Sequence, residues 1–185
     1  MRHLIHFLPK LVWIAILSLT NSLSAQVFVD LSGTGANDGT SWAYAYTDLH
    51  EAIDNSDNAT LWVAQGIYYP SSCNACSTAN REQAFELKNN ITLLGGFNGT
   101  ESASRDRDIE ANPTILSGDI GTRGDSTDNS YHVVVANNNQ LTAQLDGFTS
   151  EHGNADAPGF DRGGGLYING SFNNSSSPSI RKCTF

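Results

Sequence analysis

The fold is indicated by a string that recurs along the chain: Ile91-Thr-Leu-Leu-Gly-Gly-Phe97, Leu145-Asp-Gly-Phe-Thr149 and Ile180-Arg-Lys-Cys-Thr-Phe185. Each copy is a short run of apolar or β-branched residues that leads to a glycine or a phenylalanine, and segments rich in Asn, Gly and Ser lie between the copies. Short strands that recur between turn-forming residues are typical of a solenoid, in which each coil stacks on its neighbour.

The distances between apolar residues predict the length of a coil. Leu61 and Phe85 lie 24 residues apart, as do Ile91 and Ile115, which favours a coil of 24 residues. The 51 residues from Phe97 to Phe148 are close to two such steps. A propeller would need a longer period with four strands per repeat, and a sandwich would show strict alternation and hairpin turns.

Two further features concern the length of one coil and the pairing of its strands. Leu145 and Ile180 lie 35 residues apart, which predicts an insertion in that coil. Val133-Val-Val-Ala136 is continuously apolar, as expected of parallel strands with little access to solvent. We expect strands at 61–64, 84–87, 91–94, 114–117, 132–136, 143–148, 165–168 and 179–185.

A single stretch has clear helical spacing. Its apolar residues recur at intervals of three and four, and they are Trp42, Ala45, Tyr46, Leu49, Ala52 and Ile53. Thr47 and Asp48 form a plausible N-cap, and the polar residues 55–58 end the helix. We expect this face to cover the open end of the first coil, with each large side chain contributing about 1.5–3 kcal/mol when fully buried.

The first residues predict export. Arg2 and Lys10 flank an apolar run that is too short for a stable membrane span, and small residues up to Ala25 suit cleavage. A membrane anchor is the alternative. Cleavage would remove two basic residues and no acid, leaving eight basic against nineteen acidic residues and a net charge of −11. Such a surface repels nucleic acid and anionic lipid.

The predicted organisation is therefore a leader (1–25), an N-terminal strand and capping helix (26–59) and the solenoid coils (60–185). Phe185 falls inside a predicted strand, so we expect the chain to be the N-terminal part of a longer protein. An unpaired strand at that end would promote association between chains.

The residues also resemble a known family. The segments 26–30, 35–42, 46–53 and 60–68 look like the start of secreted bacterial right-handed parallel β-helix proteins with the pectin-lyase-like fold, and the resemblance extends to Phe185. Gly163-Gly-Gly-Leu-Tyr167 and Cys183-Thr-Phe185 resemble repeats of polymorphic outer-membrane proteins. The resemblance implies an all-β, right-handed parallel β-helix with a short N-terminal capping helix. It does not imply one activity, because this fold hosts lyases, hydrolases, adhesins and passive surface proteins.

The cysteines predict one disulfide. Cys73 and Cys76 lie in a polar loop of an exported chain, which favours a local disulfide over a zinc or redox site. Cys183 lies in a predicted strand and is expected to be a buried thiol.

One acidic loop offers weak candidates for calcium. Asp119, Asp125 and Asp128 supply oxygen ligands on a turn-rich segment, but the favoured interpretation is that they cap turns. The tripeptide Arg123-Gly-Asp125 in this loop matches an integrin motif, and we interpret it as a turn.

A carbohydrate-active enzyme is the alternative function. A lyase would need a base, for which Arg105, Arg107 and Lys182 are the candidates, while a hydrolase would need two carboxylates such as Asp119 and Asp146. His132 and His152 precede and follow predicted strands.

The favoured function is an exported cell-surface or secreted protein with a binding, adhesion or structural role. Its partner would be a polysaccharide or the surface of a host or neighbouring cell, with no nucleic acid, no transmembrane segment after cleavage and no cofactor other than calcium. We assign no catalytic or cofactor-binding residue from the sequence.

Overall fold

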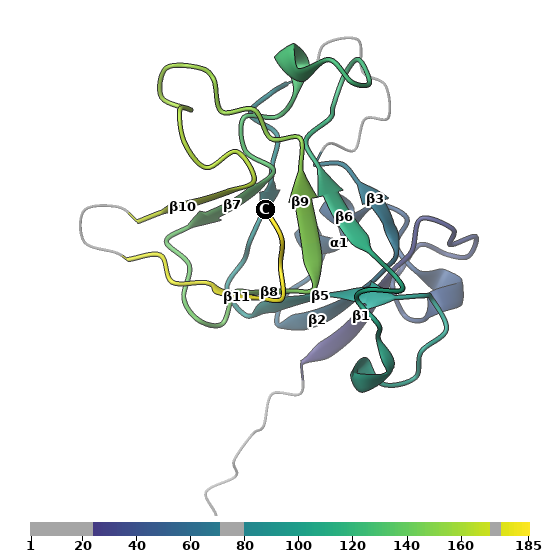
Figure 1. Cartoon of the computed structure of the whole chain (residues 1–185). Coiled ribbons are helices and arrows are strands. Elements are labelled where there is room, and N and C mark those ends of the chain that lie inside the picture. Colours follow the sequence, from purple (N-terminus) through teal and green to yellow (C-terminus); the bar gives the residue numbers. More distant parts are fainter. Residues whose placement is uncertain (1–23, 71–79, 171–174) are drawn as a thin grey trace, which may run out of the picture.

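Residues 24–70, 80–170 and 175–185 are described by the computed structural model, and they form an all-β parallel solenoid of about four turns (Figure 1). The architecture is consistent with a right-handed parallel β-helix, as predicted. The first sheet has the order β1 (Ala25–Val29), β2 (Ala59–Ala64), β5 (Ile91–Phe97), β8 (Gln144–Asp146) and β11 (Ser179–Arg181). All of its strands pair in parallel.

Two shorter parallel sheets complete the coils. One contains β3 (Gly66–Tyr68), β6 (Thr114–Ser117) and β9 (Phe148–Glu151), and the other contains β4 (Phe85–Glu86), β7 (Val134–Asn137) and β10 (Leu166–Asn169). Each coil contributes one strand to each sheet in chain order, so that β2, β3 and β4 form the first coil. The three sheets surround the interior in Figure 1.

The recurring strings stack on one another in the first sheet. Leu61, Leu93, Leu145 and Ile180 occupy one register of the ladder, and the first three of them are buried in the core. Alternate residues of the same strands point to the opposite face. That outer face carries a second ladder, which consists of Trp62, Leu94, Asp146 and Arg181.

The expected coil length of 24 residues is wrong. Successive ladder residues Leu61, Leu93, Leu145 and Ile180 are separated by 32, 52 and 35 residues. Leu61 and Phe85 lie in β2 and β4, which are two strands of the same coil, so their spacing measured part of a turn. The 52-residue coil carries long loops on both sides of β6. The 35-residue step from Leu145 to Ile180 is a single coil, as predicted.

Most strand positions follow the predictions, with three exceptions, of which the first is that the strand expected over 179–185 ends at Arg181. The strand at 114–117 is confirmed at both ends, whereas the one expected over 143–148 divides at Gly147 into β8 and β9. Gly147 has a φ of 86°, a left-handed conformation that turns the chain from the first sheet into the second. The strand β3 was not predicted, because three residues give too short an apolar pattern.

The predicted helix is shorter than its apolar pattern. The helix α1 spans Leu49–Asp54, and its N-cap Asp48 accepts a hydrogen bond from the backbone N–H of Glu51. The N-cap is therefore Asp48, the second residue of the expected Thr47–Asp48 pair, and Leu49 and Ile53 join the solenoid core. Trp42 lies outside this helix, in the short 3-10 helix η1 (Trp42–Tyr44).

The expectation that Trp42 covers the open end of the coil is wrong. Its ring packs edge-on against Phe28 at 4.8 Å and lies 5.7 Å from Phe97, while Trp62 stacks on Phe97 at 4.7 Å. Trp62 belongs to the outer ladder of the first sheet, so these four aromatic rings form a cluster on the outside of the coil. The apolar pattern of residues 42–53 therefore combines residues that contact two surfaces. Leu49 and Ile53 face the core, and Trp42 contacts the outer aromatic cluster.

Candidate binding pocket on the outer face of the first sheet

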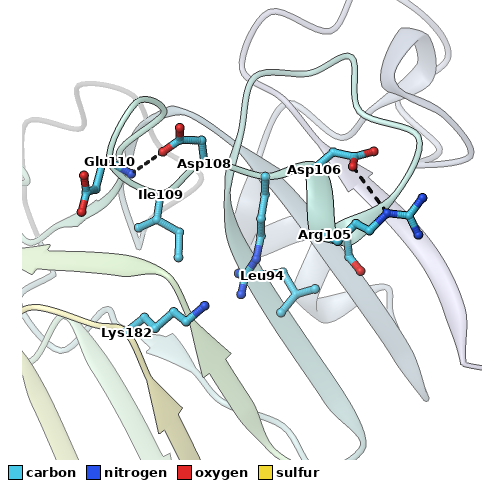
Figure 2. Close-up of a pocket in the computed structure, with 9 residues that line it drawn as sticks. Leu94, Arg105, Asp106, Asp108, Ile109, Glu110 and Lys182 are labelled. Atoms are coloured by element: carbon cyan, nitrogen blue, oxygen red, sulfur yellow. Dashed lines mark hydrogen bonds and ion pairs between the residues drawn. The ribbon is translucent and has the colours of Figure 1, made fainter.

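A pocket of about 720 Å³ lies between the outer face of the first sheet and the loop that follows β5 (Figure 2). Its volume is within the usual range of small-ligand sites. Leu94 of the outer ladder and Ile109 of the loop supply apolar surface, and Lys182 lies directly after β11. The remaining lining residues are Ser104, Arg105, Asp106, Arg107, Asp108 and Glu110.

Glycines at the corners of two coils hold the loop against the solenoid. Gly96 lies inside β5 and Gly147 lies between β8 and β9, with φ values of 94° and 86°. A Cβ atom at Gly96 would lie 2.8 Å from Ile109, and one at Gly147 would lie 2.9 Å from the same side chain. Ile109 therefore packs in a space that exists because neither corner carries a side chain.

Arg107 fastens the loop to the sheet. Its Nη2 donates to Oδ1 of Asp146 at 2.8 Å, and its Nη1 donates to the backbone carbonyls of Gly95 and Asp146, each at 3.1 Å. The two side chains are only 12% and 15% exposed. Arg107 thus links the loop to β5 and β8, and three of its five N–H donors are engaged in doing so.

Lys182 continues the row of corner residues into the last described coil. It follows Arg181 as Gly147 follows Asp146, and its φ of 47° places it in the same left-handed region. A residue with a Cβ atom costs roughly 1–2 kcal/mol in this conformation. A long cationic side chain thus stands where the preceding coil has glycine, and it lies below Ile109 in the pocket (Figure 2).

The polar groups around the pocket differ in how far they are engaged. Arg105 turns toward Asp106, at a distance of 3.7 Å, on the side of the loop away from Lys182 (Figure 2). Asp108 accepts through Oδ1 from the backbone N–H groups of Glu110 and Ala111. Among the described residues, neither the ammonium of Lys182 nor the carboxylate of Glu110 has a hydrogen-bond partner. The pocket therefore offers one free donor group and free carboxylate oxygens beside apolar surface.

The three residues that the sequence offers as bases for a lyase all line this pocket, but they differ in their contacts. Arg105, Arg107 and Lys182 all line it. Arg105 pairs with its neighbour Asp106, whereas Arg107 pairs with Asp146. That partner lies 39 residues away in the sequence, and only the stacking of coils reveals it.

The two carboxylates considered for a hydrolase serve separate contacts. Asp146 lies in β8 of the first sheet and binds Arg107. Asp119 follows β6 of the second sheet and accepts from the backbone N–H of Gly124 at 3.0 Å. Their coils are stacked, but the residues lie on different sheets of the solenoid.

The acidic loop after β6 uses its carboxylates for hydrogen bonds within the loop. Asp128 accepts from the backbone N–H of Thr122, and Asp125 accepts from the N–H and the hydroxyl of Thr127. Hydrogen bonds from Thr127 hold the pKa of Asp125 below its usual value. Within the described parts of the chain, no group of three or more His, Cys, Asp or Glu side chains is arranged to hold a metal ion.

The Arg123-Gly124-Asp125 motif is a turn, as predicted. The guanidinium of Arg123 lies 3.9 Å from the centre of the Tyr69 ring and also hydrogen-bonds to its hydroxyl. Asp125 is the N-cap of the 3-10 helix η3 (Ser126–Asp128). Both charged side chains of the motif are therefore engaged within the molecule.

The remaining candidates have structural contacts. His132 is 8% exposed, its Nδ1 lies 3.2 Å from the carbonyl of Gly163, and its ring stacks on Tyr167 at 4.6 Å. His152 Nδ1 lies 3.3 Å from a carboxylate oxygen of Glu151.

Cys183 is half-buried, and burial raises the pKa of its thiol. It is a free cysteine, as predicted, but it lies beyond the end of β11 and is not fully buried, so the expected position inside a strand is wrong. Cys73 and Cys76 lie outside the described residues, so their predicted disulfide stays a prediction.

Sequence reasoning missed the apolar part of the pocket and Glu110. Leu94 lies in a predicted strand, but the sequence pattern does not show which side of the sheet it faces. Ile109 belongs to no apolar pattern in the sequence. One signal was present: aligning Leu145-Asp-Gly147 with Ile180-Arg-Lys182 places a lysine at a position where the earlier copy has glycine. Comparison of the chain with protein-family models, with curated proteins and with solved structures found no match.

Helices of the described residues were also considered as membrane spans, and none of them is long and apolar enough to cross a bilayer.

Proposed function

We propose that this chain is an exported cell-surface or secreted β-helix protein that binds a polysaccharide at the pocket on the outer face of the first sheet. The observation that carries the proposal is the combination of Leu94 and Ile109 with the free ammonium of Lys182 and the free carboxylate of Glu110. Apolar surface suits the C–H faces of a sugar ring, and converging donors and acceptors suit its hydroxyl groups.

The position of the pocket also supports a binding role. It opens on a parallel sheet whose outer ladder runs across successive coils, so an extended chain has a surface to follow beyond the pocket. The aromatic cluster around Trp62 lies on the same face at the β1 end. The resemblance of the sequence to secreted bacterial β-helix proteins agrees with this proposal.

A polysaccharide lyase or glycoside hydrolase is the second candidate, because Arg105, Lys182, Asp108 and Glu110 line one pocket. Binding is favoured over catalysis for two reasons. Asp108 and Glu110 are exposed, whereas a carboxyl group that acts as a general acid is generally buried. Arg107, the best-positioned cation, already has Asp146 and two carbonyls as partners.

The experiment that tests the proposal is a binding assay of the expressed chain on a panel of immobilised polysaccharides. We expect retention on at least one polysaccharide and weaker retention of the double variant Lys182→Gly, Glu110→Gln. Loss of retention in an Arg162→Gln control, which changes an exposed arginine paired with its neighbour Asp161, would point to non-specific adsorption.

Two further measurements address the rest of the proposal. Release of unsaturated or reducing ends from the retained polysaccharide would favour the enzyme. Sequencing of the exported N-terminus should give Gln26, and an intact Met1 would contradict export by cleavage at Ala25.

A further inference from the structure

We infer that the ligand of the pocket is a neutral, hydroxyl-rich saccharide rather than a polyanion. This inference rests on the proposed function, and it names the class of polysaccharide. It follows from the charges that surround the pocket, from the hydrogen-bonding capacity that is left free there, and from the single corner at which lysine replaces glycine.

The charges around the pocket cancel. Three cationic side chains line it, and so do three carboxylates, Asp106, Asp108 and Glu110. A fourth carboxylate, Asp146, is bound to Arg107. The group therefore has no excess of positive charge, and the whole chain has a formal net charge of −9. A polyanion would meet repulsion from the carboxylates and from the protein as a whole.

The cations that remain are unequally available. Arg107 is mostly buried and donates to three protein oxygens, and Arg105 is turned toward Asp106. Lys182 is then the lining cation without a hydrogen-bond partner among the described residues, and the nearby loop carries Asp108 and Glu110, which add two negative charges. One ammonium beside two carboxylates is a poor receptor for a string of carboxylates or sulfates.

The same arrangement suits hydroxyl groups. A hydroxyl donates one hydrogen bond and accepts others, so neighbouring hydroxyls of one sugar can donate to Glu110 and accept from Lys182. Hydrogen bonds to charged groups are stronger than those between neutral groups. The apolar side chains of Leu94 and Ile109 lie beside these groups in the pocket.

The backbone at Lys182 makes a sharp test available. Its left-handed conformation is the one that glycine adopts readily, and Gly147 occupies the equivalent corner of the preceding coil. A Lys182→Gly variant therefore removes the ammonium while easing the backbone, and we expect it to fold. Glu110→Gln keeps the size and a hydrogen-bonding oxygen but removes one negative charge.

The experiment measures binding of the full chain by titration calorimetry with matched oligosaccharides. The probes are neutral cellohexaose and N-acetylated chitohexaose, and acidic hexagalacturonate, each at low and at high salt. We expect a neutral probe to bind with little dependence on salt, and Lys182→Gly to weaken it by about five- to tenfold. Arg162→Gln is the matched control and should bind as the unmodified chain does.

Three outcomes would overturn the inference. Salt-sensitive binding of hexagalacturonate alone, strengthened by Glu110→Gln, would show a polyanion site and leave the proposed function standing. Binding of a neutral probe that Lys182→Gly leaves unchanged would place the neutral saccharide elsewhere. Failure of every probe, together with failure of the polysaccharide panel, would remove the proposed function itself.

Discussion

Replacing Asp146 by asparagine should loosen the loop that forms one wall of the pocket. The substitution keeps the shape of the side chain but removes the charge that faces Arg107 at 2.8 Å. Both side chains are at most 15% exposed, so solvent screens their interaction far less than it screens a surface pair. Arg107 would keep its two carbonyl acceptors, and it would lack its counter-charge.

The magnitude follows from these contacts. Removing one partner of a buried ion pair costs about 3–5 kcal/mol, and losing one hydrogen bond to a charged group costs about 1.5–3 kcal/mol. Because two carbonyls still accept from Arg107, we expect Asp146→Asn to lower the free energy of unfolding by about 2–3 kcal/mol. For a chain of this size, that corresponds to a decrease in Tm of about 4–12 °C.

Urea unfolding followed by circular dichroism measures the change, and Asp161→Asn is its matched control. Asp161 also pairs with an arginine, Arg162, but the two side chains are 65% and 80% exposed. The control should change stability by less than about 0.5 kcal/mol. If Asp146→Asn is as mild as the control, the ion pair does not hold the loop in solution, and the account of the pocket wall is wrong.

Three further predictions concern other parts of the fold. Gly147→Ala should destabilise the chain by about 2–3 kcal/mol, which is more than Gly124→Ala. Both positions have positive φ, but of the two only Gly147 has a neighbour within 4 Å of the added Cβ. Equal losses of stability in urea unfolding would contradict this. Cys183 should react with iodoacetamide more slowly in the folded chain than in urea, because burial raises its pKa; equal rates by mass spectrometry would show that the thiol is open. Because its hydrogen bonds lower the pKa of Asp125, the carboxylate stabilises its turn at neutral pH, and this contribution is lost as the pH falls through the lowered pKa. The amide signal of Thr127 should therefore titrate with a midpoint below the usual value of 3.8, and a midpoint above it would refute the N-cap.

The fold could be predicted because the core imposes a pattern on the sequence. Leu93, Leu145 and Ile180 all point into the same interior. Each must therefore be apolar, and each must occupy the same position within its strand. The length of the loops is under no such constraint. An insertion between two strands, such as residues 98–113, changes the period without changing which strand residues face the core. A search for a fixed repeat therefore found the strands and gave the wrong coil length.

The helix illustrates a second limit of periodicity. Leu49 and Ile53 face the core from α1, whereas Trp42 contacts the outer aromatic cluster. Spacing of three and four residues indicates a shared face only while the chain stays helical. The backbone turns between η1 and α1, so Trp42 points to a different surface, whereas Tyr46 still packs against the core. The N-cap was a more reliable signal, because it depends on neighbours within one turn.

The pocket was only partly predictable. The sequence shows which residues have suitable chemistry, but it does not show which strands are stacked. Chemistry alone selected Arg105, Arg107 and Lys182, but the choice of Asp146 as the partner of Arg107 depends on which strands are stacked. The corner row gives the clearest physical argument for function. Gly147 is explained by its left-handed turn and by the packing of Ile109, whereas Lys182, at the equivalent position of the next coil, opposes the backbone preference. Packing of the core does not call for a lysine at that corner, and glycine would relieve its backbone. The saccharide contact proposed for its ammonium would account for a lysine at this position.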